Sequence, residues 1–384
     1  MKMLNSEKLE KNIDLRMAGD QESGKVGGSG IAVMQNGKEI YKKYFGKFSY
    51  SGESCSEVGD TTLFRLASMT KPVTAAAVLI QAERGRLFLD RPISDWLPEF
   101  KDMDIGAFDG ERHIIRVRKS PVQLTLRHLL SHTNGLCSGD LGYTEYNQIP
   151  PEQHKTLKSV VEYLSGVALD FEPMTAQGYS ATAAFDVAAR LVELTSDMSY
   201  DMFLKKNIFE PCEMGDTTFF PTEDQWQRTV IMHRRTDDGR SADSQTIPGC
   251  VFENMPATCF SAGAGLLSSL PDYVKFAEML CRGGRTADGR QLLSPRLINE
   301  MGSPWVSDSI MPGPQKWGLG VRVICAPYHM PEHSFGWSGA YGSHFWVDPV
   351  NQITAVYMKN SRYDGGAGCV TSVNFERDVY NALE

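Results

Sequence analysis

A serine and a lysine lie three residues apart in the stretch FRLASMTKPVTAAAVLIQAE, as Ser68 and Lys71. Residues 73–82 have the composition of a helix, and Pro72 is tolerated in a first helical turn. Because residues i and i+3 share one face of a helix, the Lys71 amine can reach the Ser68 hydroxyl. Free N–H groups at a helix start also favour negative charge. The pair therefore predicts a serine nucleophile with a lysine as its base.

The pair needs a dry pocket, because a lysine acts as a base only when neutral and burial favours the neutral form. It also needs a second group that handles protons. Tyr179, in QGYSATAAFDVAARLVE, precedes another helical run and can relay protons between nucleophile and leaving group. The alternative is that Ser68 only caps a helix and Lys71 is solvated, since roughly one or two S-x-x-K matches are expected by chance.

A glycine-rich stretch near the C-terminus, HSFGWSGAYGSHFWVDP, has the features of a strand that approaches other backbone closely. Its glycines, Gly336, Gly339 and Gly342, leave room for such an approach. A strand placed in this way can aim an N–H group at an oxyanion that develops during the reaction.

Strand-rich segments are expected at both ends of the chain, with helices between them. Residues 4–18 have helical spacing, and a hairpin with an Asn36-Gly37 turn follows. Towards the C-terminus the sequence predicts strands over 317–323, 345–347 and 353–358 and a closing helix over 377–383. Helical patterns fill LTLRHLLSHTNGL, SVVEYLSGVAL and AAFDVAARLVELTSD, and long loops are expected around 101–120 and 221–260.

The order of these motifs resembles the serine β-lactamase and penicillin-binding-protein superfamily. The likeness is greatest to class C β-lactamases, family VIII esterases and the acyltransferases of the lovastatin-synthase type. Further segments agree in the family's order, namely ERGRLFLDRPISDWLPEF, LTLRHLLSHTNGL, IFEPCEMGDTTF and WSGAYGSHFWVDP. The resemblance runs from about residue 8 to the C-terminus.

The resemblance implies a role for each motif residue. Ser68 would be the acylated nucleophile, Lys71 its base or proton partner, and Tyr179 would assist acylation and deacylation. The backbone N–H groups of Ser68 and Ala340 would form the oxyanion hole. The family's K-T-G or H-x-G strand motif, which binds substrate, would correspond to Trp337, Ser338 and Gly339.

The resemblance also implies an α+β fold of the β-lactamase/transpeptidase type, an antiparallel sheet flanked by helices with an inserted, mostly helical domain. Residues 1–92 and 260–384 would form the discontinuous sheet domain, and residues 93–259 the helical domain. The active site would lie at the seam between the two.

Two departures from the family pattern bear on the substrate. Ala181 stands where the family's Y-x-N motif has Asn, and Trp337 replaces the Lys of K-T-G. Both changes remove polar contacts for penicillins and D-alanyl peptides. The sequence therefore favours a carboxylesterase on short-chain or aryl esters, with transfer to another hydroxyl as an option. The alternatives are β-lactamase or D-alanyl peptidase activity on an amide, and a catalytically silent binding domain.

Two other motifs suggest different chemistry. The segment 336–340, GWSGA, is close to the G-x-S-x-G elbow of α/β-hydrolases, but that motif needs a helix after it, and YGSHFWVDP predicts a strand and a turn. His128 and His132 have the i, i+4 spacing of a zinc pair, yet Leu129 replaces the Glu of H-E-x-x-H. These histidines are expected to pack in a core helix, and no metal or cofactor is expected.

Composition restricts the class of protein further. The 384 residues carry a net charge of −8, which argues against a nucleic-acid partner. The N-terminal stretch lacks the apolar region of a signal peptide, and no apolar run is long enough to span a membrane. The eight cysteines are scattered, as expected for reduced thiols. The sequence thus predicts a cytoplasmic protein that acts on small molecules.

Overall fold

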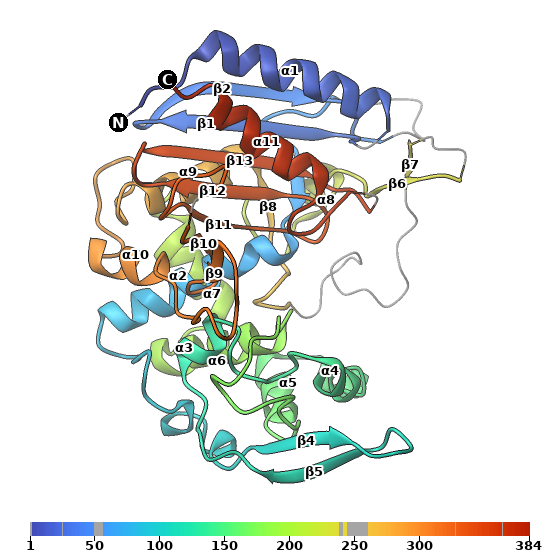
Figure 1. Cartoon of the computed structure of the whole chain (residues 1–384), viewed down its shortest axis with the longest axis vertical. Helices are drawn as coiled ribbons and strands as arrows, with labels where there is room; N and C mark the ends of the chain where they lie inside the picture. Colours follow the sequence, from blue (N-terminus) through green and yellow to red (C-terminus); the bar gives the residue numbers. More distant parts are fainter. Residues whose placement is uncertain are drawn as a thin grey trace.

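The computed structural model describes residues 2–24, 26–49, 57–237, 241–243, 260–326, 328–362 and 364–384. A large sheet occupies the upper half of Figure 1, and helices from the middle of the chain occupy the lower half. The helices are α1 (Ser6–Glu22), α2 (Thr70–Glu83), α3 (Leu126–Leu130), α4 (Asp140–Tyr146), α5 (Leu157–Leu164), α6 (Ala183–Ser196), α7 (Tyr200–Leu204), α8 (Glu223–Gln227), α9 (Leu270–Cys281), α10 (Pro295–Met301) and α11 (Val370–Asn381). Among them, no helix has the length and apolar content to cross a bilayer.

The large sheet joins the two ends of the chain. Its strands follow the order β2-β1-β13-β12-β11-β10-β9, and neighbouring strands are antiparallel. Asn36 and Gly37 form the predicted turn between β1 and β2, with φ of 52° and 72°. The predicted α+β fold is confirmed. The strands of this sheet are β1 (Ser29–Gln35), β2 (Lys38–Phe45), β9 (Gln315–Trp317), β10 (Arg322–Ile324), β11 (Phe335–Ser338), β12 (His344–Asp348) and β13 (Ile353–Lys359).

Both faces of the sheet are covered, so its central strands are apolar on both sides. On β13, Ile353, Ala355 and Tyr357 belong to the cluster beneath α1 and α11, whereas Val356 and Met358 belong to the main core beneath α9. This alternation follows from the two-residue period of a strand. Burial on both faces explains why every residue of β13 is buried and most of them are apolar.

Helix α2 lies where the sheet and the helical half meet. It contacts α6 and α10, and 12 of its 14 residues are buried. The Gly320 turn packs so closely that a Cβ there would lie 3.0 Å from the Lys71 carbonyl oxygen. The helix thus carries Lys71 into the centre of the molecule. The predicted domain limits, 1–92 with 260–384 and 93–259, stay a prediction.

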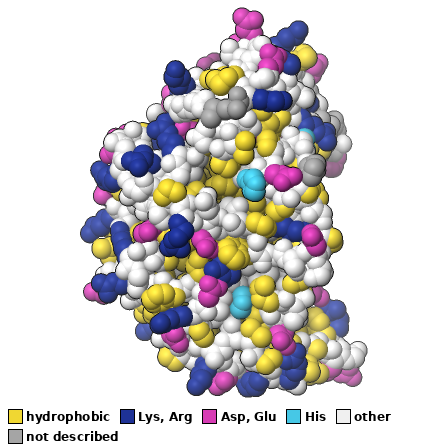
Figure 2. Space-filling model, turned by 60° about the vertical axis from the view of Figure 1, so that its left-hand side comes forward, with side chains coloured by type: hydrophobic (Ala, Val, Ile, Leu, Met, Phe, Trp, Pro, Cys, Tyr) yellow, Lys and Arg dark blue, Asp and Glu magenta, His cyan; other side chains and the backbone are white. Residues whose placement is uncertain are grey.

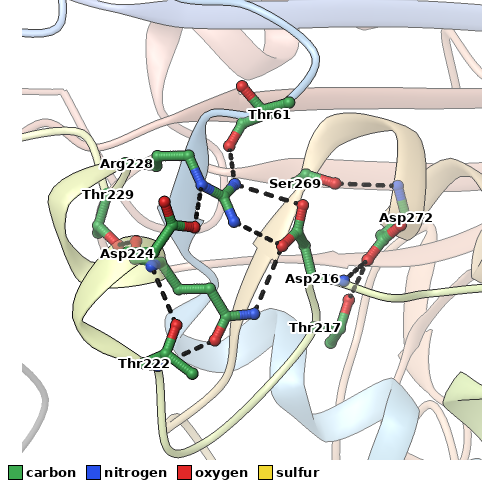
Figure 3. Close-up of polar contacts among 10 residues, drawn as sticks. Thr61, Asp216, Thr217, Thr222, Asp224, Arg228, Thr229, Ser269 and Asp272 are labelled. Carbon is green, nitrogen blue, oxygen red and sulfur yellow. Dashed lines mark hydrogen bonds and ion pairs between the residues drawn. The ribbon is translucent and has the colours of Figure 1, made fainter.

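A small strand pair fixes the chain just before Ser68. Strand β3 (Leu63–Arg65) pairs with β8 (Leu267–Ser269), and Figure 3 shows the polar contacts beside them. The Arg228 guanidinium donates to Asp216 and Asp224, at 2.8 and 2.9 Å. The Asp272 carboxylate accepts from the Asp216 N–H at 2.7 Å. These contacts tie the 216–228 segment to the start of α9 and so brace β3.

Some local predictions were wrong. The single strand expected over 317–323 is instead the end of β9, a tight turn and the start of β10, because Gly320 has φ of 72° and Trp317 pairs with Arg322. The loop expected around 101–120 is a hairpin of β4 (Asp104–Phe108) and β5 (Ile114–Lys119), visible at the lower end of Figure 1. Strand β5 is exposed from Ile115 onward and mixes apolar with basic residues.

Other predictions need smaller corrections. The closing helix runs over Val370–Asn381 rather than 377–383. Part of the loop expected over 221–260 contains α8, β6 (His233–Arg235) and β7 (Ser241–Asp243). Residues 238–240 and 244–259 lie outside the described residues.

Candidate active site

The structure brings Ser68 and Lys71 together as predicted. Ser68 lies in the 3-10 turn Ala67–Met69 directly before α2, and it is partly exposed. Lys71 is fully buried, with its Nζ atom 3.2 Å from Ser68 Oγ. Ala67, just before Ser68, has a left-handed φ of 46°, a strained conformation for a residue with a side chain.

Two backbone carbonyls complete the surroundings of the Lys71 amine. Nζ donates to the Ala181 oxygen at 2.5 Å and to the Gly263 oxygen at 2.9 Å. In the neutral amine, these two bonds use both N–H groups and leave the lone pair for the third neighbour, Ser68 Oγ. The arrangement therefore suits an amine that accepts the Ser68 proton.

Tyr179 lies beside this pair. Lys71 Nζ is 4.8 Å from the centre of the Tyr179 ring. The indole Nε1–H of Trp337 donates to the Tyr179 hydroxyl oxygen at 3.1 Å. Because the oxygen accepts this bond, the hydroxyl proton stays available for donation to a reacting group.

Side chains that sequence reasoning missed hold the Tyr179 segment in place. The Tyr143 hydroxyl donates to the Tyr179 carbonyl at 2.8 Å and accepts from the Ala181 N–H at 3.0 Å. His132 Nδ1 accepts from the Ser180 N–H at 3.2 Å. Tyr143 and His132 therefore set the direction of the Ala181 carbonyl that binds Lys71.

The two histidines of the possible zinc pair lie in different environments. His128 Nδ1 accepts from the Thr125 N–H in a capping box at the start of α3. His132 lies beyond the end of α3, with φ of 56°, so the two do not share one helix. Burial and the charges of Lys71 and Arg322 lower the pKa of His132 well below its usual value, so the ring is neutral. No group of three metal-binding side chains occurs among the described residues.

Asp186 is a second residue that the sequence did not reveal. Its carboxylate is buried and accepts from the Ala262 N–H at 2.7 Å and from Ser261 Oγ at 3.0 Å. These bonds fix the turn whose next carbonyl, that of Gly263, binds Lys71. Burial raises the pKa of Asp186 to about 7, although hydrogen bonds and the Lys71 charge oppose this. Asp186 and Ser261 are 75 residues apart in the sequence, and no local sequence pattern predicts their contact.

The end of β11 lies against the chain just before Ser68. A Cβ on Gly339 would be 2.3 Å from the Leu66 carbonyl oxygen, so only glycine permits this approach. Ala340 follows at an exposed position, and no acceptor for its N–H occurs among the described residues. This free donor is compatible with the oxyanion role predicted for Ala340, which the structure does not test.

Trp337 and Ser338 point to different partners. The Trp337 indole faces Tyr179, whereas Ser338 Oγ lies 2.8 Å from His344 Nδ1. Neither side chain shows a direct role in substrate binding, which stays a prediction. The segment 336–340 joins β11 to β12 with no helix after it, so the α/β-hydrolase elbow does not apply.

Comparison with known proteins extends these observations. A family model described as Beta-lactamase matches residues 9–373. Esterase EstB of Burkholderia gladioli is 26% identical over 375 residues, covering 90% of this chain and 88% of that protein. Lovastatin esterase of Penicillium rubens is 28% identical over 288 residues, covering 73% and 69%. The solved structure of EstCE1, a hydrolase with promiscuous acyltransferase activity, has a TM-score of 0.80 at 21% identity and covers 98% of this chain and 99% of that one. The resemblance predicted from the sequence is confirmed.

Proposed function

Since the chain belongs to the beta-lactamase family, we propose that it is a serine hydrolase that cleaves esters through an acyl-enzyme on Ser68. The observation that carries the proposal is the buried Lys71 amine, which lies 3.2 Å from Ser68 Oγ and is held by two backbone carbonyls. Similar proteins include one named an esterase and one named a lovastatin esterase, which supports esters as substrates.

Acylation follows from this arrangement. The neutral Lys71 amine takes the Ser68 proton while Oγ forms a bond to the ester carbonyl carbon. The N–H groups of Ser68 and Ala340 receive the oxyanion. The bond to the alkoxy group then breaks, and the Tyr179 hydroxyl protonates the departing oxygen. The Lys71 ammonium returns a proton to Tyr179.

Deacylation reverses these roles. Tyr179 first passes its proton to the neutral Lys71 amine, and the resulting tyrosinate accepts the proton of an incoming water as the water oxygen attacks the acyl carbon. Ser68 then leaves with a proton from the Lys71 ammonium, which restores the phenol and the neutral amine. Another hydroxyl in the place of water would give acyl transfer instead. The partial exposure of Ser68 and Tyr179 allows either acceptor to enter.

The two sequence departures favour esters over β-lactams. Ala181 contributes a carbonyl to Lys71 and offers only a methyl side chain to an amide substrate. An unpaired amide group of a bound substrate costs about 1–3 kcal/mol. Trp337 donates its one N–H to Tyr179 and adds apolar surface. β-Lactamase activity is the second candidate, because the family includes it.

A substrate panel and a covalent probe test the proposal. We expect p-nitrophenyl acetate and butyrate to be hydrolysed with a higher kcat/KM than any penicillin or chromogenic cephalosporin. A fluorophosphonate should label Ser68, as mapped by mass spectrometry. Penicillin turnover faster than ester turnover would overturn the choice of substrate. Absence of labelling on folded protein would favour a silent binding domain.

A further inference from the structure

The peptide bond between Gly339 and Ala340 sets the direction of the candidate oxyanion donor. A peptide unit is planar and almost always trans, so the Ala340 N–H points opposite to the Gly339 carbonyl oxygen. That oxygen accepts from the Gly342 N–H at 3.0 Å and from the Gly366 N–H at 3.1 Å. Gly342 belongs to the same turn, whereas Gly366 lies in the segment between β13 and α11. The direction of the Ala340 N–H therefore depends on where that segment places Gly366.

The segment that contains Gly366 is rich in glycine, with the sequence Gly-Gly-Ala-Gly over residues 365–368. It lies so close to the β11–β12 turn that a Cβ on Gly365 would be 2.3 Å from the Ala340 carbonyl oxygen. Gly366 and Gly368 have φ of 83° and 75°, which favours glycine at both positions. Because glycine has no side chain to pack, a segment of this composition is ordered by contacts at its ends.

Asp364 joins the two ends of the glycine-rich segment. Its carboxylate accepts from the Val370 N–H at 3.0 Å and from the Thr371 N–H at 3.3 Å, both at the start of α11. An anion is favoured there, because the first N–H groups of a helix have no partner within the helix. The position of the Asp364 carboxylate therefore sets the position of Gly366.

Lys359 in turn holds the Asp364 carboxylate. It is the last residue of β13 and is 1% exposed. Its Nζ atom donates to Asp364 Oδ2 at 2.7 Å and to Thr371 Oγ1 at 2.5 Å. Its stem lies against the turn, since a Cβ on Gly342 would be 2.1 Å from Lys359 Cε. Burial alone would raise the pKa of Asp364, but the Lys359 charge and hydrogen bonds keep it below its ordinary value, so the carboxylate is ionised.

Stability alone does not account for a buried ion pair. Figure 2 shows basic and acidic side chains interspersed on one face of the molecule, where water solvates them. Moving two charges into the interior costs free energy that their attraction often fails to offset, and apolar residues of similar size often serve stability as well. A buried pair can instead fix one arrangement of the chain. Lys359 and Asp364 form such a pair beside the turn that carries Ala340.

We propose that Lys359 and Asp364 are positioning residues for the oxyanion hole, which fix the Gly366 N–H and through it the direction of the Ala340 N–H. This inference rests on the proposed function, because it assigns a role in the reaction at Ser68. An oxyanion donor acts mainly in the transition state, so a misdirected Ala340 N–H lowers kcat and leaves KM nearly unchanged. Loss of a merely structural pair would lower the melting temperature instead.

A double variant without either charge tests the proposal, because it leaves no unpaired charge in the interior. In Lys359→Met/Asp364→Leu, the kcat for p-nitrophenyl butyrate should fall at least about tenfold while KM stays within about threefold. Lys359→Met/Asp364→Asn keeps an oxygen acceptor for the Val370 N–H, so its kcat should fall less. Lys158→Met/Glu162→Gln removes an exposed ion pair on α5 and is the matched control.

Phenylboronic acid measures the same contact without turnover. Its boron bonds to Ser68 Oγ as Lys71 takes the proton, and the tetrahedral adduct places an oxygen where the oxyanion would form. Its affinity is measured by how well it protects Ser68 from a fluorophosphonate. This affinity should fall at least about tenfold in the Lys359→Met/Asp364→Leu variant and hold in the control.

The outcomes separate this inference from the proposed function. If wild type hydrolyses esters and the Lys359→Met/Asp364→Leu variant keeps its kcat and its boronate affinity, the positioning role is wrong and the proposed function stands. A rise in KM that equals the fall in kcat would also overturn the role. If that variant does not fold, Lys359→Met/Asp364→Asn decides by the same two measurements. If wild type forms no adduct at Ser68 with either probe, the inference and the proposed function are both wrong.

Discussion

Ser68 and Ser338 each lie within hydrogen-bond distance of a basic side chain. Ser68 Oγ lies 3.2 Å from Lys71 Nζ, and Ser338 Oγ lies 2.8 Å from His344 Nδ1, with Glu376 behind the histidine. By residue types alone, the second set looks more like a serine–histidine–carboxylate triad. The two serines differ in where they lie relative to the neighbouring helix or strand.

Ser68 lies in the turn directly before helix α2, whereas Ser338 is the last residue of strand β11 and pairs with β12. Backbone N–H groups at the start of a helix are free to receive an oxyanion, and the strained Ala67 conformation presents Ser68 at the surface. Ser338 pairs with His344 across β11 and β12, and its side chain is 4% exposed. A hydrogen-bonded partner is therefore not enough to make a nucleophile. The serine also needs free donors nearby and access for the substrate.

Exchanging each serine for alanine gives the largest expected effect. Ser68→Ala should lower the turnover of p-nitrophenyl butyrate by at least about 10³-fold, because the covalent step is lost. Ser338→Ala should keep activity within roughly tenfold and should still be labelled by a fluorophosphonate. Circular dichroism and thermal melting would check that both variants fold. A label on Ser338 in the wild type would reverse the comparison.

The second-largest expected effect comes from removing the proton-transfer groups, and it should differ between the two networks. Lys71→Ala and Tyr179→Phe should each lower the rate by roughly 10²–10⁴-fold, the usual cost of losing a general acid or base. If the two residues share one proton path, the double variant should be hardly slower than either single variant. His344→Gln, in the other network, is the control and should have a far smaller effect. If the rate losses of the two single variants multiply in the double variant, the two residues act on separate proton paths.

Local patterns were enough to predict that the Ser68 and Lys71 side chains meet. Ser68 and Lys71 are three residues apart, and one helical turn brings them together. The Asn36-Gly37 hairpin and the β12–β13 turn are likewise set by neighbouring residues. Tyr179 was predicted from motif order, since 108 residues of chain separate it from Lys71 and no periodicity links them.

The groups that position the candidate catalytic residues could not be predicted in this way. Asp186 contacts Ser261 across 75 residues, and the guanidinium of Arg322 meets Trp337 only because β10 pairs with β11. Such contacts depend on how strands and helices pack, which single-chain patterns do not encode. The 317–323 error has the same origin, because an apolar run with glycines fits one strand as well as a tight hairpin.

The two networks also contain buried carboxyl groups with opposite pKa shifts. Asp186, near Lys71, has its pKa raised to about 7 by burial. A carboxyl whose pKa is raised by folding stabilises the protein below its unfolded value of about 4, and this stabilisation is lost as pH rises through 7. Between pH 5 and pH 8, wild type should therefore lose on the order of 3 kcal/mol of unfolding free energy that Asp186→Asn does not lose.

Urea denaturation at both pH values measures this loss. Asparagine keeps an oxygen acceptor for the Ala262 N–H, so the variant should fold. Asp102→Asn, at an exposed position, is the matched control and should follow wild type. Parallel pH profiles for wild type and Asp186→Asn would show that Asp186 is already ionised at pH 5.

Glu376, in the other network, should show the reverse pH dependence with a smaller effect. Burial alone would raise its pKa, but hydrogen bonds from His329 and His344 lower it to about 2. A carboxyl whose pKa is lowered by folding stabilises the protein above its unfolded value of about 4.5, and this stabilisation is lost as pH falls towards 2. Between pH 5 and pH 3, wild type should lose about 2 kcal/mol more unfolding free energy than Glu376→Gln, as measured by urea denaturation.

Glu99→Gln, which is exposed, is the control. An equal acid loss in wild type and Glu376→Gln would mean that the two imidazoles do not hold this carboxylate in its ionised form, and the contrast between the two networks would then rest on their serines alone.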